Sequence, residues 1–177
     1  MANVGIDNIS EVLKQPDKFV WIGLHEPSAE MLSKIQREFG LHDLAIEDAH
    51  RAHQRPKIEA YGDSLFIVLR TVQMNEQQIE LGETHFFVGH NFIITVRHGS
   101  SLSYTDVRAR CESTPHLLKR GPGFALYAIM DSIVDPSADV IWESVAEILT
   151  AAGAKDDATR RRSSIPLTGS SSPRARR

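Results

Sequence analysis

The stretch that most constrains the fold is His85–Val96, which reads HFFVGHNFIITV. Two apolar runs flank Gly89-His90-Asn91, and a short polar segment in this position is typical of the tight turn of a β-hairpin. Successive side chains of a strand point to opposite faces of a sheet, so consecutive apolar residues place apolar groups on both faces. We therefore expect a sheet that other elements cover on both sides.

Segments with a helical pattern flank the strands and could provide that cover. PSAEMLSKIQREFG has apolar residues at helical spacing, with Ser28 as the expected N-cap and Gly40 at the end. LHDLAIEDAHRAHQ predicts a shorter helix that stops before Pro56. Further strands are expected in KFVWIGLHE and at residues 65–72, and SYTDVRARCESTPHLLKRG predicts a helix that breaks or restarts at Pro115. This order predicts an α/β fold with a mostly antiparallel mixed sheet sandwiched between helices.

Charge is distributed unevenly along the chain. The formal net charge is -3, but residues 155–177 hold seven basic and two acidic residues, which leaves -8 for residues 1–154. An acidic body excludes nucleic acid as the expected partner, because duplex binding needs clustered positive charge. It suits a protein that binds cations. Cys111 is the single cysteine, so no internal disulfide can form, which fits a reducing compartment.

No segment of the sequence has the pattern of a secretory signal or of a membrane span. The N-terminus contains acidic residues and lacks a long apolar core. The longest apolar stretch, GFALYAIMDSIV, is interrupted by Asp131 and is shorter than the roughly 20 residues that a spanning helix needs. We expect the chain to be soluble and cytoplasmic.

Acidic residues provide the first candidate cation site. Glu47 and Asp48 are adjacent on a predicted helix and point about 100° apart, so they cannot chelate one ion as a pair. Each could bind an ion with groups from elsewhere, and hard cations such as Mg²⁺ prefer oxygen ligands. The alternative is that they only complement the helix dipole. Asp131 interrupts an apolar helical stretch, where a carboxylate requires coordination or a basic partner such as arginine.

Histidines near these acids offer a second possible site. Glu47 and His50 have the i, i+3 spacing of di-iron helical bundles, and His53 follows at the same interval. A di-iron site needs a second such pair, which the sequence lacks, so a metalloenzyme built on these residues stays as an alternative only. No nucleophile or phosphate-binding motif indicates another enzyme, and we expect none. His85 and His90 flank the hairpin turn and are expected at the surface.

Three stretches together resemble the N-terminal cytoplasmic domain of CorA-type magnesium transporters, a family with a zinc-transporting, ZntB-like branch of the same fold. They are FGLHDLAIEDAHRAHQRPKIEAYGDSLFIVLR, FFVGHNFIITVR and YAIMDSIVD. The resemblance spans about residues 19–135. It implies an α/β/α funnel domain, a homopentamer, and a long stalk helix that leads to two membrane helices with a Gly-Met-Asn motif.

The resemblance also implies where a regulatory cation binds. In the family, Mg²⁺ lies between neighbouring cytoplasmic domains, on carboxylates of the helix matching IEDA, of the start of the stalk helix and of a position further down the stalk. Glu47, Asp48 and Asp131 match the first two sources, and the third has no counterpart in this sequence. Other divalent cations, such as Co²⁺, Ni²⁺ or Zn²⁺, are compatible with the same ligands.

The sequence departs from the family in its C-terminal part. It has no membrane helices and no Gly-Met-Asn motif, and Pro136 interrupts the region where the family continues its stalk helix. We therefore predict three parts. They are a CorA-like α/β/α domain at residues 1–135, a degenerate or truncated stalk-helix segment at residues 136–152, and a basic, Ser/Arg-rich disordered tail at residues 153–177.

Two functional hypotheses follow. In the first, the chain is the cytoplasmic domain of a CorA-like divalent cation transporter, as a fragment or truncated homologue at the inner membrane. It binds regulatory Mg²⁺ at subunit interfaces and cannot itself transport. Its partner is itself, as a homopentamer in the full-length family and a dimer or monomer for this chain, with membrane contact only through missing C-terminal helices. In the second, the chain is a protein-interaction module that keeps the fold without binding ions.

Overall fold

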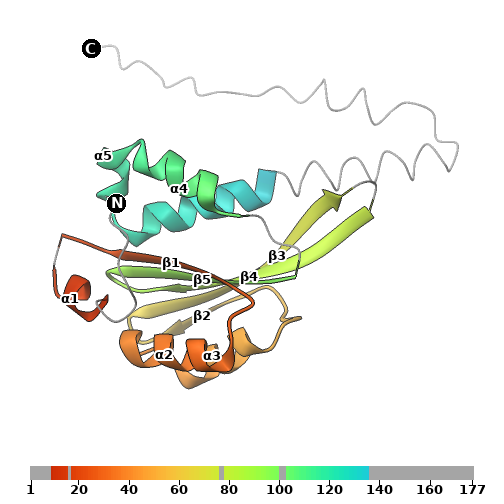
Figure 1. The fold of residues 1–177 in the computed structure, drawn as a ribbon, viewed down its shortest axis with the longest axis horizontal. Coiled ribbons are helices and arrows are strands. Elements are labelled where there is room, and N and C mark those ends of the chain that lie inside the picture. Colours follow the sequence, from red (N-terminus) through yellow and green to blue (C-terminus); the bar gives the residue numbers. More distant parts are fainter. Residues whose placement is uncertain (1–8, 16, 76–77, 100–102, 136–177) are drawn as a thin grey trace, which may run out of the picture. The chain divides into compact units, whose positions relative to one another are not determined.

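A five-stranded sheet forms the centre of the fold (Figure 1). The computed structural model describes residues 9–15, 17–75, 78–99 and 103–135, which lie within one compact unit, Met1–Val140. The strands are β1 (Val20–His25), β2 (Lys57–Tyr61), β3 (Ser64–Asn75), β4 (Gln78–Val88) and β5 (Phe92–Gly99). Their order is β1-β5-β4-β3-β2, with β1 and β5 parallel and the other neighbours antiparallel. The predicted mostly antiparallel mixed sheet is confirmed.

The predicted hairpin joins β4 to β5. Val88 and Ile93 face each other across the two strands, and the Gly89 N–H donates to the carbonyl oxygen of Phe92 at 3.0 Å. A Cβ atom at Gly89 would lie only 2.3 Å from the Phe92 ring, so this turn requires glycine. β2, β3, β4 and β5 pair in sequence order as one antiparallel meander, and β1 adds to it beside β5.

Two helices cover one face of the sheet (Figure 1). α2 (Ala29–Phe39) begins where the Ser28 hydroxyl accepts a hydrogen bond from the Met31 N–H, and it ends at Gly40, whose φ of 62° is left-handed. Both predicted caps are confirmed. α3 (Asp43–His50) follows. The core on this face consists of Leu32, Ile35, Leu41, Ala45, Ala49, Phe66, Val68, Phe87, Phe92, Ile94 and Val96.

Three helical segments cover the opposite face (Figure 1). They are α4 (Thr105–Glu112), α5 (Pro115–Leu118) and a helix that is described over residues 122–135. Pro115 lies in the first turn of α5, where its missing N–H costs nothing, so the predicted restart is confirmed. The core on this face consists of Ile67, Phe86, Val88, Ile93, Tyr104, Val107, Cys111, Ala125, Ala128, Ile129 and Ile133.

Adjacent residues of the hairpin enter different cores. Phe87 and Ile94 pack under α2 and α3, whereas Phe86 and Ile93 pack under the helices of the other face. Full burial of such a side chain stabilises the fold by about 1.5–3 kcal/mol. The predicted layer of helices on each side of the sheet is therefore confirmed, and the apolar runs around residues 89–91 are its cause.

Some of the predictions concern residues outside the described ranges. The short helix α1 (Ile9–Leu13) precedes β1. The stalk segment at residues 136–152 and the tail at residues 153–177 lie outside the described residues. Within the described ranges, no helix combines the length and the apolar character that crossing a membrane requires.

Candidate cation site

α3 presents its acids because its smallest residues face the sheet. Ala45 and Ala49 are buried in the core on that side, so the helix contacts the strands through methyl groups. Glu47 and Asp48 therefore leave the helix on sides that do not face this core. The His42 imidazole caps the first turn of the helix by accepting a backbone hydrogen bond. The predicted helix and the position of both acids on it are thus observed.

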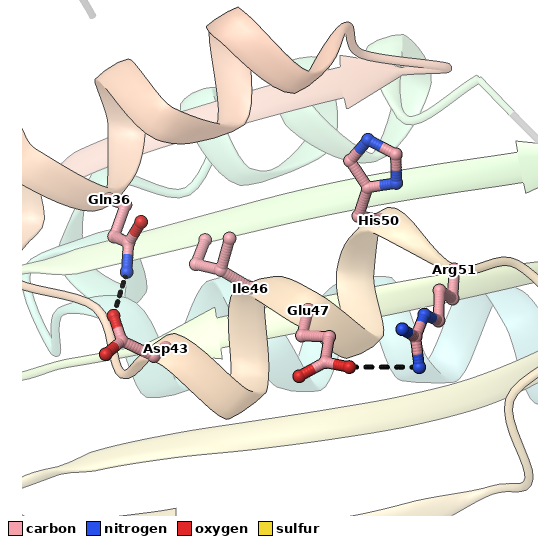
Figure 2. Close-up of a pocket in the computed structure, with 6 residues that line it drawn as sticks. All are labelled: Gln36, Asp43, Ile46, Glu47, His50 and Arg51. Atoms are coloured by element: carbon pink, nitrogen blue, oxygen red, sulfur yellow. Dashed lines mark hydrogen bonds and ion pairs between the residues drawn. The ribbon is translucent and has the colours of Figure 1, made fainter.

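Glu47 borders an open hollow of ≈ 350 Å³, lined by Gln36, Asp43, Ile46, Glu47, His50 and Arg51 (Figure 2). Its Oε1 lies 2.9 Å from Nη1 of Arg51, one helical turn on. Asp43 points instead toward Gln36, whose Nε2 donates to it at 2.6 Å. His50 points away from both carboxylates (Figure 2). These potential ligands do not converge on a common point.

Asp48 has a different partner from Glu47, because adjacent side chains of a helix point about 100° apart. Its Oδ2 lies 2.6 Å from Nζ of Lys57, the first residue of β2. The same Nζ lies 2.9 Å from Oε2 of Glu59, which also accepts a hydrogen bond from the Tyr61 hydroxyl. The Asp48 side chain is 25% exposed, so this ion pair is partly shielded from water. One lysine therefore bridges two carboxylates at the junction of α3 and β2.

Electrostatics favour the charged forms of Lys57 and Glu59. Burial by itself lowers the pKa of Lys57, but hydrogen bonds and charges from Asp48 and Glu59 outweigh it, so the pKa lies above its ordinary value. The hydrogen bond from Lys57, followed by that from Tyr61, holds the pKa of Glu59 below its usual range. Lys57 and Glu59 therefore stay ionised around neutral pH.

Asp131 lies on the helix over residues 122–135, which packs on the face of the sheet opposite α3. Its Oδ2 is 3.5 Å from Nη2 of Arg110, which also donates to the carbonyl oxygen of Ala128. The basic partner that the sequence suggested for this acid is thus present. Since the sheet separates Asp131 from Asp48, a single copy of the chain cannot bring both to one ion.

The metalloenzyme alternative finds no support in the structure. His50 points away from Glu47 (Figure 2), and His53 lies beyond the helix with a φ of 76°. Among the described residues, no group of three or more His, Cys, Asp or Glu side chains is arranged to hold a metal ion. The i, i+3 spacing of these residues therefore does not produce a ligand set.

The prediction that His85 lies at the surface is wrong. Its side chain is 0% exposed, and its Nε2 lies 3.1 Å from Oε1 of Glu83, which is 3% exposed. Burial lowers the pKa of His85 and outweighs the opposing effect of the Glu83 charge. Strand periodicity is the signal that could have indicated this: residues 83, 85 and 87 share one face of β4, and Phe87 belongs to the core.

The residues that fasten the end of α3 to the sheet were not predicted from the sequence. The His98 Nε2 lies 2.8 Å from the carbonyl oxygen of Ala49, and its Nδ1 lies 2.9 Å from Oε2 of Glu26. One turn beyond the helix, the His53 N–H donates to Glu83 at 2.8 Å. These contacts position the helical turn that carries the two candidate acids.

Comparison with known proteins identifies the family. The family model of the CorA-like Mg²⁺ transporter protein matches residues 16–154. The chain belongs to this CorA-like family. YfjQ of Bacillus subtilis strain 168, whose name describes a metal ion transporter, is 31% identical over 144 residues, which are 81% of this chain and 43% of that protein. The cobalt/magnesium transport protein CorA of Thermotoga maritima is 27% identical over 121 residues, or 65% of this chain and 34% of that protein.

The CorA-like fold is confirmed by comparison with solved structures. The soluble domain of CorA from Methanocaldococcus jannaschii aligns with a TM-score of 0.56 at 19% identity, over 81% of this chain and 60% of that chain. The predicted family and α/β/α architecture are therefore confirmed. This chain spans less than half of the length of the two curated relatives above.

Proposed function

We propose that this chain is the cytoplasmic regulatory domain of a CorA-like divalent cation transporter and binds Mg²⁺ between two copies of itself. Glu47 and Asp48 of one copy and Asp131 of the next would supply the carboxylates. Family membership supports the role, because relatives are named as metal ion and cobalt/magnesium transporters. We propose an interface because the sheet lies between Asp48 and Asp131, so these two acids of one copy cannot bind the same ion.

The proposed site has weak affinity for chemical reasons. Each acid already has a basic partner: Arg51 for Glu47, Lys57 for Asp48 and Arg110 for Asp131. Partly exposed pairs of this kind are worth roughly 0–1 kcal/mol, so a divalent ion can replace them at millimolar concentration. Mg²⁺ keeps several waters and often uses only one or two carboxylates. Co²⁺, Ni²⁺ and Zn²⁺ are expected to compete at the same ligands.

The proposed role is regulation through binding, and we assign neither conduction nor catalysis to the chain by itself. The three acids lie on helices that pack against a sheet, not in a membrane span, and the relatives are named as transporters. In this proposal the partner is a further copy of the chain, assembled as a homopentamer on the cytoplasmic side of the inner membrane.

A second candidate function is a protein-interaction module that keeps the fold without binding ions. The observation that favours it is the same set of internal ion pairs, because Glu47, Asp48 and Asp131 are each neutralised without any metal. The two functions differ in whether added Mg²⁺ changes the association of the chain.

A mixing experiment tests the proposed function. We expect millimolar MgCl₂ to increase association of the chain in sedimentation velocity, and Asp48→Asn or Asp131→Asn to abolish the increase. An interface between the two variants can still pair Asp131 of one copy with Asp48 of the other. An equimolar mixture of the variants should therefore recover part of the response. Asp63→Asn, an exposed acid in the turn between β2 and β3, is the matched control.

The outcomes separate the two candidate functions. If Mg²⁺ does not change the association of the wild-type chain, the regulatory site is contradicted. The interaction module then remains as the candidate function. Loss of the response in both variants without recovery in the mixture would show that the acids act separately, not across one interface. Circular dichroism of each variant checks that the fold is retained.

A further inference from the structure

We infer that Lys57 is a tethered cation that competes with the divalent ion for Asp48 and so sets the ion concentration at which the site fills. The inference rests on the proposed function, and concerns its regulation. A lysine ammonium group in contact with the ligand must leave the carboxylate oxygen before a metal ion can take its place. The affinity of the site then depends on the strength of the internal pair as well as on the ligands.

The contact between Lys57 and Asp48 is the closest of the three pairs that involve the candidate acids. Nζ of Lys57 lies 2.6 Å from Asp48, whereas the pair of Glu47 spans 2.9 Å and that of Asp131 spans 3.5 Å. The side chains of Lys57 and Asp48 are 27% and 25% exposed, and those of Arg51 and Glu47 are 70% and 51% exposed. Water therefore screens the Lys57 pair least.

The surroundings of Lys57 hold its ammonium group at Asp48. Nζ lies 5.6 Å from the centroid of the Phe66 ring, within the range of a cation–π interaction. Phe66 belongs to the core beneath α3, so this ring is fixed in place. β2 starts at Lys57 and pairs with β3, which restricts where its backbone can move. Lys57 is thus positioned by the sheet, whereas Asp48 is positioned by α3.

Glu59 makes the exchange feasible. When a divalent ion takes Asp48, the ammonium group of Lys57 keeps its second partner, the Glu59 carboxylate at 2.9 Å. The ammonium group is not left without a counter-ion, which would be costly in a partly buried position. Glu59 also attracts the ammonium group of Lys57, so the two carboxylates, Asp48 and Glu59, compete for the same lysine. The structure therefore contains both a competitor for the ion and an acceptor for the displaced competitor.

A series of variants tests this mechanism on the whole chain, with MgCl₂ as the probe and ionic strength held constant by NaCl. Half-saturation is measured from the amide resonance of Asp48 in ¹⁵N–¹H spectra. Lys57→Met keeps an apolar stem beside Phe66 and removes the charge. It should lower the half-saturating Mg²⁺ concentration about three- to fivefold, the effect of removing a partly exposed ion pair. Lys57→Arg keeps the charge and should stay near the wild-type value.

Two further variants make the test directional. Glu59→Gln removes the acceptor for displaced Lys57, so it should raise the half-saturating concentration, opposite to Lys57→Met. Lys14→Met changes the net charge equally at an exposed pair with Glu11 and should have no effect. An equal shift in Lys14→Met and Lys57→Met would overturn the inference, since net charge alone would explain it.

The failure of this inference is distinguishable from failure of the proposed function. If wild type and Lys57→Met both respond to Mg²⁺ at the same concentration, the site exists and the competition does not. If neither responds, the proposed site is absent and the inference falls with it. A response in Lys57→Met alone would show that the lysine outcompetes the ion, so the competition would hold while the regulatory role of the wild-type chain would be contradicted.

Discussion

Both ring nitrogens of His98 face hydrogen-bond acceptors, the carbonyl oxygen of Ala49 at 2.8 Å and the carboxylate of Glu26 at 2.9 Å. A hydrogen bond from the Gly99 N–H, followed by that from His98, holds the pKa of Glu26 below its usual range. The ring centroid of His85 lies 5.4 Å from that of His98.

Burial, together with the proximity of His98, predicts acid sensitivity at His85. Burial, and to a smaller extent His98, lower the pKa of His85 below the ordinary value near 6.5, so the folded state favours the neutral ring. The stabilisation is present above about pH 6.5 and is lost as the pH falls below it, because the unfolded chain binds the proton more readily.

The measurement is the free energy of unfolding in urea between pH 7.5 and 5. It should decrease with acid in the wild-type chain, and His85→Gln should flatten the slope while keeping a donor toward Glu83. His116→Gln, at an exposed position on α5, should leave the slope unchanged. An unchanged slope in His85→Gln would assign the acid sensitivity to other groups.

At the scale of elements, α3 depends on a buried carboxylate for its C-terminal anchor. Glu83 of β4 accepts the His53 N–H at 2.8 Å and lies 3.7 Å from Nε of Arg70 on β3. Arg70 in turn donates to the carbonyl oxygen of Gln54 at 3.0 Å. The segment between α3 and β2 is thus held by two residues of neighbouring strands. This anchor determines where Asp48 stands relative to Lys57.

Removal of this carboxylate should loosen the end of α3. Glu83→Ala leaves the His53 N–H and the buried His85 without their partner, and we expect it to cost about 2–3 kcal/mol of stability. Hydrogen exchange of the segment at residues 50–54 should speed up more than that of α2. Glu83→Gln keeps an oxygen acceptor for His53 and should lose less protection. Equal protection in all three proteins would contradict the anchoring role.

At the scale of the whole molecule, two cores share one sheet. Phe86 and Phe87 are neighbours in β4, yet each packs into a different core. Strands buried on both faces couple the two layers of helices, because neither layer can leave without exposing the sheet. The described unit is therefore expected to unfold as one cooperative structure.

Paired substitutions test this coupling. Phe86→Leu and Phe87→Leu should each lower the free energy of unfolding by about 1 kcal/mol. Both should shift one common transition in guanidinium chloride, seen alike by far-ultraviolet circular dichroism and tryptophan fluorescence. Two separate transitions, each sensitive to one substitution, would show instead that the cores unfold independently.

Local features of the fold were predictable because their causes act over a few residues. The turn at residues 89–91, the Ser28 cap, the Gly40 stop and the restart at Pro115 each follow from backbone preferences or from a hydrogen bond one turn away. The alternation that places apolar groups on both faces of β4 and β5 is likewise local. The sequence by itself thus determined most of the elements, though not β2, together with the double covering of the sheet and, through its motifs, the family.

The partners of Asp48 and Asp131 were decided by tertiary structure, whereas Glu47 pairs with Arg51 one helical turn away. His98 meets Glu26 across 72 positions of sequence and His53 meets Glu83 across 30, so no local pattern encodes either contact. Burial of His85 depends in the same way on which helix covers its strand. Strand register and helix packing bring Lys57 to Asp48 and place the sheet between Asp48 and Asp131. The physical reason is that charge pairing and desolvation depend on distance in space, which only the assembled layers establish.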